Sequence, residues 1–437
     1  MITAFKDTFK IPDLRRRIIF TVALLTVYRL GCYVPTPGID GKALAQFFAR
    51  VPNTLFGIAD LFAGGALSNA TIFALGIMPY ISVSIILELL ASIVPYFENM
   101  VRSGVEGRRK LTQITRFGTV GLCLFQGTAI SFWLSNPAHF ENVVMVPNPG
   151  PLFYFTTVVT LTTGTIFLMW LGEQITEKGI GNGISLIITA SILSRMPVAV
   201  HYLAMLMGAG EINIIIILIL IALLVLIISA AIILNESERR IAIQYARRVV
   251  GRRVYGGQST YLPIKLNQGG VIPLIFAVSI LTFPATMMRF SENVVLRRVA
   301  DYLMPSGGPG MLLYALLTIF FCYFYASIIF NPDNVSEDLK KYGGFVAGIR
   351  PGKATAAYLE KILNRLTLPG SLMLAFIALF PYILMHFVRK IPPLVASEFG
   401  GIGLIIVVSV LIETMRQIEA HLLVRHYQGF IKKARPR

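Results

Sequence analysis

The chain has 437 residues, of which 55% are hydrophobic and 14% are charged, and its mean hydropathy is +0.71. This composition excludes an ordinary water-soluble domain. The sequence also lacks HExxH, GxSxG and GxxxxGK[ST], the commoner signatures of zinc hydrolases, serine hydrolases and nucleotide-binding loops. We therefore expect no enzymatic activity: no catalytic residues, no cofactor and no metal site.

Continuous apolar runs define the expected elements along the chain. A hydrocarbon core of ~30 Å requires about 20 apolar residues per helix. Ten segments approach that length, in chain order 18–34, 71–94, 111–134, 152–172, 183–207, 211–234, 271–288, 311–330, 368–388 and 401–423. A β-barrel would instead show short alternating strands. The sequence thus predicts an all-α polytopic membrane protein with ten transmembrane helices.

Lys and Arg are unevenly distributed between the loops. Most of the 39 basic residues fall in alternate loops that share one side of the membrane, above all in 235–265 and 331–366. Cytoplasmic loops collect Lys and Arg. Both termini are therefore predicted to be cytoplasmic.

Two short patterns recur in the two halves of the chain, residues 1–208 with helices 1–5 and residues 209–437 with helices 6–10. Gly76 opens a Gly-aliphatic-x-Pro-x-Ile pattern in helix 2, and Gly270 opens the same pattern in helix 7. Helices 5 and 10 both begin Gly-Ile-x-Leu-Ile-Ile. Matching interrupted segments in two inverted halves indicate the functional centre. Helices 2, 5, 7 and 10 are therefore candidates to line it, although their isoleucines could equally face lipid or pack the bundle.

Residues 56–70 read FGIADLFAGGALSNA, a piece too short to span a bilayer and too apolar for a solvated loop. Apolar residues recur in it at spacings of three or four, which is typical of one helical face. Gly64 and Gly65 would weaken such a helix by about 1 kcal/mol each relative to Ala. A short helix that can dock and be displaced fits this pattern, and so does a re-entrant or surface-lying helix.

The repeated positions carry isoleucine and no charge. Intramembrane charges are costly and are kept for function, and Glu88 and Glu413 are the main acidic candidates in the apolar runs. An aliphatic constriction suits a pore that admits varied cargo and gates by dewetting. The alternative class is a small-solute secondary transporter with inverted repeats, whose site would lie around these two acids.

Four longer stretches stand out in the chain: LGIMPYISVSII (75–86), WLGEQITEKGIGNGIS (170–185), QGGVIPLIF (268–276) and GIRPGKAT (348–355). They resemble the SecY family, the central channel subunit of the bacterial protein translocase, and the resemblance covers nearly the whole chain. It implies ten helices in two pseudo-symmetric inverted halves around a central pore. The implied function is translocation of unfolded preproteins across the cytoplasmic membrane and lateral insertion of membrane proteins into it.

The resemblance also implies roles for individual residues. The aliphatic pore ring maps to Ile77, Ile81, Ile184, Ile188, Ile275 and Ile406. The plug is residues 56–70, represented by Ile58, Leu61, Phe62, Gly64, Gly65 and Ala66. The lateral gate between helices 2–3 and 7–8 maps to Ser82, Thr115, Asn267 and Phe283. The basic loops, with Arg252, Arg253, Arg350 and Lys353, would receive the ribosome and the motor.

Partners and location follow from the same resemblance. The implied partners are SecE-like and SecG-like small membrane subunits, the SecA ATPase motor, the ribosome through its RNA, signal sequences and nascent chains, and membrane lipid. The implied location is the bacterial cytoplasmic membrane, which the chain crosses several times.

Overall fold

The computed structural model places a helical segment at each of the ten predicted apolar runs. It describes residues 11–50, 60, 63–140, 143–210, 212–245, 248–250, 253–255, 259–290, 293–303, 308–387, 395 and 401–433. The ten spans are α2 (Pro12–Gly31), α5 (Met78–Ile93), α7 (Val105–Ser135), α8 (Pro151–Lys178), α9 with α10 (Gly183–Leu193 and Met196–Gly208), α11 (Ile214–Glu236), α12 (Ile272–Phe290), α14 (Gly308–Ile329), α16 (Lys353–Phe387) and α18 (Ile402–Lys433).

Length and apolar composition alone qualify six of the described spans as membrane-crossing, or seven if α5 and the following helix α6 (Pro95–Arg102) count as one span bent by 101°. The apolar part of α12 is short, at Ile272–Leu281. α2 begins among the arginines Arg15–Arg17, and α18 continues into a polar end. The prediction of ten transmembrane helices therefore agrees with the fold, although three spans are less apolar or shorter than the rest.

Two predicted boundaries differ from the structure. Helix 2 begins at Met78 instead of residue 71, because Gly76 has φ +58° and the preceding residues form turns. A left-handed residue cannot continue a right-handed helix. Helix 9 begins 15 residues before the predicted 368, at Lys353, since a polar helical extension precedes its apolar part.

The smaller elements connect these spans. They are helices α3 (Gly41–Arg50), α13 (Val294–Leu303) and α15 (Pro332–Lys341), the 3-10 helix η1 (Pro137–Phe140), and strands β1 (Glu238–Tyr245), β2 (Arg248–Val250), β3 (Arg253–Tyr255), β4 (Ser259–Lys265) and β5 (Gly344–Val346).

The basic loops form an antiparallel sheet with the order β4-β1-β5. β1 pairs with β4 through Ile241 and Leu262, and with β5 through Gln244 and Phe345. Ile241 and its neighbours on the inner face pack on the ends of α14 and α16. The sheet therefore joins loop 6–7 to loop 8–9, a connection that the charge pattern did not predict.

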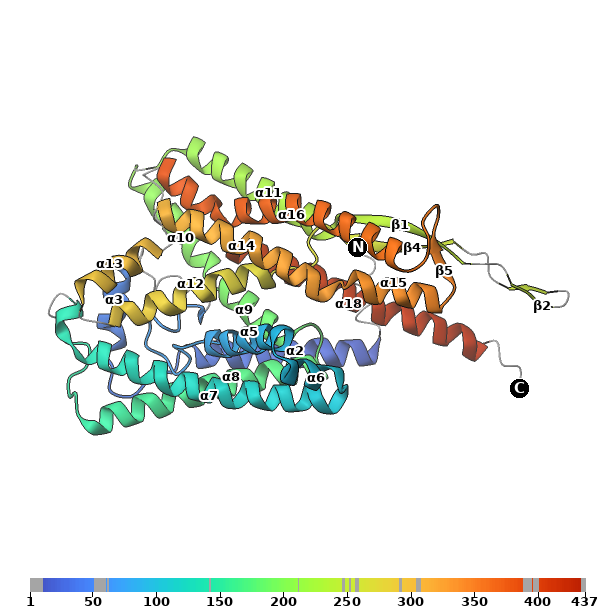
Figure 1. Ribbon diagram of the computed structural model, residues 1–437. Helices are drawn as coiled ribbons and strands as arrows, with labels where there is room; N and C mark the ends of the chain where they lie inside the picture. Colours follow the sequence, from blue (N-terminus) through green and yellow to red (C-terminus); the bar gives the residue numbers. More distant parts are fainter. Residues whose placement is uncertain are drawn as a thin grey trace.

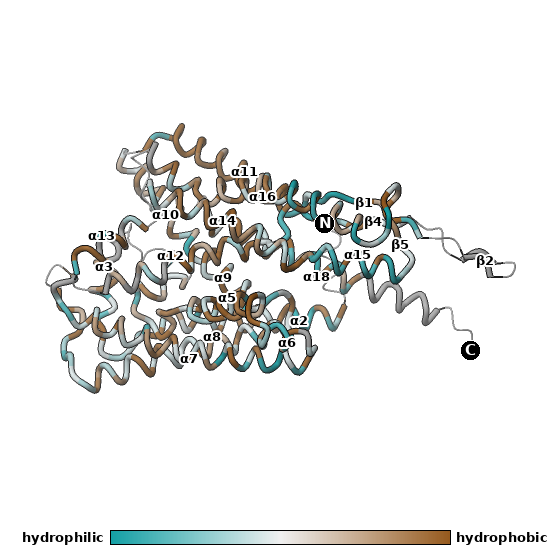
Figure 2. Tube along the Cα trace, viewed as in Figure 1, coloured by the Kyte–Doolittle hydropathy of each residue, from teal (hydrophilic) through white to brown (hydrophobic). Residues whose placement is uncertain are grey.

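Most of the spans form two groups that follow the two halves of the sequence, whereas α10 packs on α11 and α16 of the other half. In Figure 1, α2, α5, α7 and α8 lie in the lower group and α11, α12, α14 and α16 in the upper one. α5 contacts α12, and α9 contacts α18, so the repeat-related helices meet between the groups. The strands, α15, the start of α2 and the end of α18 share one end of the molecule (Figure 1), and Figure 2 shows β1, β4 and α15 at this end to be largely hydrophilic.

Charged side chains in the spans near that end form ion pairs. Arg116 of α7 donates two hydrogen bonds to Glu173 of α8, at 2.9 and 2.7 Å. Arg416 of α18 pairs with Glu236 of α11 at 2.9 Å. These charges therefore fasten neighbouring spans within the bundle.

Candidate pore, plug and gate

The six isoleucines of the predicted ring gather in one apolar cluster. Ile77, Ile81, Ile188 and Ile406 are buried there, and Ile184 and Ile275 pack against it half-buried. Ile77 caps the start of α5, and the other five lie on four helices that are distant in sequence, α5, α9, α12 and α18. The alternative that these side chains face lipid does not fit this burial.

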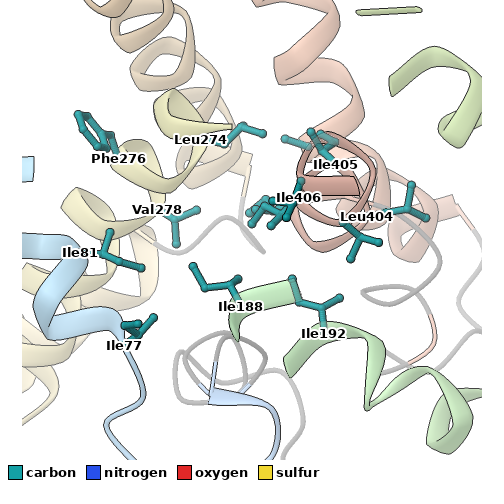
Figure 3. Close-up of a cluster of buried hydrophobic side chains, with 14 of the residues drawn as sticks. Ile77, Ile81, Ile188, Ile192, Leu274, Phe276, Val278, Leu404, Ile405 and Ile406 are labelled. Atoms are coloured by element: carbon teal, nitrogen blue, oxygen red, sulfur yellow. The ribbon is translucent and has the colours of Figure 1, made fainter. Parts of the chain in front are cut away.

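Two further side chains extend the cluster beyond the predicted six. Figure 3 shows Val278 of α12 and Ile192 of α9 beside Ile81, Ile188 and Ile406. Val278 is 3% exposed and Ile192 is 1% exposed. Val278 follows Ile275 by three residues and Ile192 follows Ile188 by four, so helical spacing could have identified both.

Local backbone geometry explains how the helices present these residues. Gly76 has φ +58° and Gly270 has φ +60°, so the repeat-related glycines share a left-handed conformation that other residues rarely adopt. Each is followed by a proline near the start of a helix, where a missing amide hydrogen costs little. The two halves thus deliver helices 2 and 7 to the centre with the same local structure.

Helix α9 begins at the centre through a different signal. The Asn182 side chain caps it by accepting hydrogen bonds from the amides of Ile184 and Ser185, at 3.2 and 3.4 Å. Asparagine is among the preferred capping residues because it satisfies amides that have no partner within the helix. This cap fixes where the helix starts, and hence the height of Ile184 and Ile188.

The described part of the plug segment, Asp60 and Ala63–Ala70, docks against this cluster. Ala63 and Ala66 are buried in the same cluster as Ile77 and Ile188. Gly64 has φ +66°, and a Cβ on it would lie 2.9 Å from the Ser191 Cα of α9. Gly64 is therefore required both by its conformation and by close contact. Gly65 also has a positive φ, while the predicted plug residues Ile58, Leu61 and Phe62 lie outside the described residues.

Polar groups fasten the same segment. The Asp60 carboxylate accepts hydrogen bonds from the amides of Leu67 and Ser68, both at 3.0 Å, and pairs with Arg195 at 3.2 Å. The Asp60 side chain is 5% exposed and that of Arg195 is 19% exposed. Arg195 marks the break between α9 and α10. Sequence reasoning gave neither residue a role.

Helix α2 holds the plug segment from another side. The Tyr28 hydroxyl donates to the Ala63 carbonyl at 3.3 Å and shares a hydrogen bond with Ser191 at 2.5 Å. Arg29 donates to the Gly64 carbonyl at 3.3 Å. The segment is thus held both by an apolar face and by side-chain hydrogen bonds from α2.

The predicted gate residues lie on the expected elements. Ser82 is on α5 and Phe283 is on α12. Thr115 of α7 is buried and donates to the Leu111 carbonyl of its own helix at 2.9 Å. Asn267 donates to the Gly270 carbonyl at 2.9 Å and to Asn235 of α11 at 3.4 Å. These hydrogen bonds of Thr115 and Asn267 therefore stay within their own halves.

The predicted docking residues lie at the hydrophilic end. Arg350 is exposed on a turn between β5 and α16, and its carbonyl accepts from the Thr355 hydroxyl at 2.8 Å. Lys353 is exposed at the first position of α16. Arg253 lies on β3, whereas Arg252 lies outside the described residues.

Within the described part of the chain, no group of three or more His, Cys, Asp or Glu side chains could hold a metal ion. The buried cluster around the isoleucines consists of apolar residues, tyrosines and the cysteines Cys32 and Cys322. Glu413 lies exposed on α18, and Glu88 lies on α5 and contacts Tyr325 of α14. The two acids of the transporter alternative thus occupy the edges of the cluster.

The chain matches known proteins over nearly all of its length. The SecY family profile matches residues 71–415. Protein translocase subunit SecY of Thermus thermophilus is 43% identical over 100% of this chain and 99% of that protein.

Solved structures share the fold. One described as "The structure of a protein conducting channel" has a TM-score of 0.65 at 18% identity and covers 93% of this chain and 92% of its own. Another, "Sec61 in the Canine ribosome-channel complex from the endoplasmic reticulum", has a TM-score of 0.60 at 18% identity and the same coverage. The two agree with the arrangement of spans described above. The chain therefore belongs to the SecY family and is a multi-pass, protein-conducting channel subunit of the cytoplasmic membrane.

Proposed function

We propose that an unfolded polypeptide enters at the hydrophilic end, displaces the plug of residues 56–70 and threads the isoleucine ring. The observation that carries this proposal is the single buried cluster in which Ile77, Ile81, Ile188 and Ile406 meet the plug alanines. In this proposal the ring is the fixed closure and the plug is the displaceable one.

The ring's chemistry suits varied cargo. Isoleucine side chains offer no hydrogen bonds to a passing chain, and an apolar constriction excludes ions by dewetting. Because the ring residues come from both halves, the constriction widens when the halves separate. The pore then closes around the chain through contacts that depend on shape alone.

Signal and transmembrane segments leave sideways in this proposal, through the seam between α5 with α7 and α12 with α14. The driving force is transfer of apolar surface into lipid, about 25 cal/mol per Å². Ser82, Thr115, Asn267 and Phe283 lie on or next to helices of this seam. They are proposed as residues that a departing segment meets.

The exposed basic loops are proposed docking sites. Segments 235–265 and 331–366 would bind the ribosome or the SecA motor, because Lys and Arg contact RNA phosphates and acidic protein surfaces. A solved relative of the same fold is a channel in a ribosome complex. The chain would catalyse no reaction, so these partners would supply the energy, and SecE-like and SecG-like subunits would complete the assembly.

The halves are proposed to be residues 1–208 and 209–437, with both termini in the cytoplasm. The boundary falls between α10 and α11, where Gly210 has φ +73°. A turn at this position separates the two halves along the chain.

Site-specific crosslinking of a stalled export substrate tests this function. A photoreactive residue at Ile81, Ile188 or Ile406 should crosslink to the substrate, whereas one at Ile219 should not. Ile219 is the matched control because it is 53% exposed on the outer side of α11. Crosslinks to Ile219 and none to the ring would contradict the proposed path.

A further inference from the structure

A hydrogen bond joins the two halves at the seam between α5 and α14. The Tyr325 hydroxyl of α14 donates to the Glu88 carboxylate of α5 at 2.7 Å. Neither residue belongs to the ring, the plug or the basic loops. The two positions are 237 residues apart in the sequence.

The position of Glu88 in the span makes this bond significant. Glu88 follows Ile81 by seven residues, which is about 10 Å along a helix. The carboxylate therefore lies on the hydrophilic-end side of the ring and still within the apolar length of α5, which ends at Ile93. Glu88 is exposed at the surface of the bundle, and a carboxylate that faces the apolar part of the bilayer is costly unless a donor satisfies it.

Packing fixes the donor in place. Tyr325 is 8% exposed, and its ring meets Phe276 of α12 edge-on, with centroids 5.3 Å apart. A Cβ on Gly269 would lie 3.3 Å from the Tyr325 Cβ. The hydroxyl is thus aimed at α5 by a closely packed neighbourhood, and a bond from a held donor to a carboxylate is among the stronger hydrogen bonds.

A second hydrogen bond between the halves lies elsewhere. The Gly181 amide, next to α9, donates to Gln417 of α18 at 3.0 Å. A segment that leaves between α5 and α14 must break the Glu88–Tyr325 bond, whereas it need not disturb the α9–α18 side. The Glu88–Tyr325 bond therefore marks the side of the bundle that opens, and the Gly181–Gln417 bond marks the side that stays closed.

We propose that the Glu88–Tyr325 hydrogen bond is a latch on the lateral seam, and that it sets how hydrophobic a signal segment must be to open the channel sideways. This inference rests on the proposed function. Breaking the latch costs free energy, and the apolar transfer of the entering segment has to offset that cost. A weaker latch should therefore admit less hydrophobic segments.

The test compares export of reporters that carry a graded series of signal segments, from marginal to strongly hydrophobic. Tyr325→Phe removes the donor and keeps the ring packing on Phe276. It should raise export of the marginal reporter about 3- to 30-fold, the range for interhelical hydrogen bonds in membranes. Export of the strongly hydrophobic reporter should not change.

Matched variants separate a latch from a general packing effect. Tyr323→Phe is the control, because the Tyr323 hydroxyl donates at 3.4 Å to Asn364 within the same half. It should leave the threshold unchanged. Glu88→Gln keeps an acceptor oxygen without the charge and should lower the threshold only partly, whereas Glu88→Ala should lower the threshold as Tyr325→Phe does.

The double variant Glu88→Ala with Tyr325→Phe decides the matter. If the two side chains act through one bond, the double variant should shift the threshold no further than the larger single shift. Additive shifts, or a Tyr325→Phe threshold equal to that of wild type, would overturn the latch while leaving the proposed function intact. A wild-type chain that exports neither reporter would overturn the proposed function and the latch with it.

Discussion

At the scale of single residues, the proposed ring is built from branched aliphatic side chains. Burying an isoleucine contributes about 1.5–3 kcal/mol, and Ile77, Ile188 and Ile406 are each 1% exposed. The side chains of the proposed ring therefore also contribute to the stability of the bundle. Removing side-chain volume there should open a path before it unfolds the protein.

We expect Ile81→Gly combined with Ile275→Gly to make resting vesicles leak ions. The side chains come from opposite halves, so their loss leaves a gap across the ring. Flux of a small anion from vesicles measures the leak. Ile219→Gly on the outer side of α11 controls for the cost of glycine in a helix, about 1 kcal/mol. Equal flux from both variants would remove these positions from the ring.

The repeats place Ile81 and Ile275, and likewise Ile188 and Ile406, at corresponding positions of the two halves, and the structure gathers all four in one apolar cluster. The ion pair of Asp60 with Arg195 and the bond of Glu88 with Tyr325 were not predictable in the same way. Their partners are 135 and 237 residues apart, and no local pattern relates them. Such pairs arise only when the helices pack, and the packing is a property of the whole chain.

At the scale of elements, the plug combines a strained backbone with polar fastening. Gly64, Gly65 and Ala70 all have positive φ, so the segment cannot relax into a regular helix. Its stability in place comes from the buried alanines and from the groups of Asp60, Arg195 and Tyr28 that hold it. The sequence indicated a displaceable segment but not what holds it.

We expect Arg195→Gln to raise the frequency of spontaneous channel opening. A largely buried ion pair that loses one member costs about 3–5 kcal/mol. The free-energy cost of breaking the Asp60–Arg195 pair should be smaller, about 1–3 kcal/mol, because the Arg195 side chain is 19% exposed. Single-channel recording in planar bilayers measures the opening frequency.

Arg116→Gln is the matched control for that experiment, since it breaks an ion pair between α7 and α8 that is remote from the plug. The control should open no more often than wild type. If both variants open equally often, the Asp60–Arg195 pair does not hold the plug.

Element boundaries were the less predictable part of the fold. Helix 2 was expected from residue 71, but hydropathy cannot reveal that Gly76 adopts a left-handed conformation. The small sheet was missed because the charges of RRIAIQY conceal its alternation of exposed and buried residues. Ile241 and Ile243 are buried while the residues on either side of them are exposed.

At the scale of the whole molecule, charge separates the two ends of the bundle. Basic strands and α15 lie at one end, and the start of α2 and the end of α18 lie there with them (Figures 1 and 2). The asymmetry of Lys and Arg predicted this grouping from the sequence. It could do so because insertion responds to loop charge, which is local.

Cysteine labelling should confirm the orientation. We expect Lys340→Cys, on α15, to react with a membrane-impermeant maleimide only from the cytoplasmic side, and Asn148→Cys only from the opposite side. Both positions are exposed. The native Cys32, Cys123 and Cys322 are buried and provide a low background. The reverse pattern would contradict cytoplasmic termini.

The three-stranded sheet has a mechanical consequence. β1 and β4 follow α11 and precede α12, and β5 precedes α16, so all of its connections lead into the second half of the chain. A force applied to the sheet is therefore transmitted to several spans of the second half of the chain and to no span of the first half. We therefore expect a partner bound to the sheet to act as a lever: a force on it would move the second half of the chain relative to the first and so widen the proposed ring.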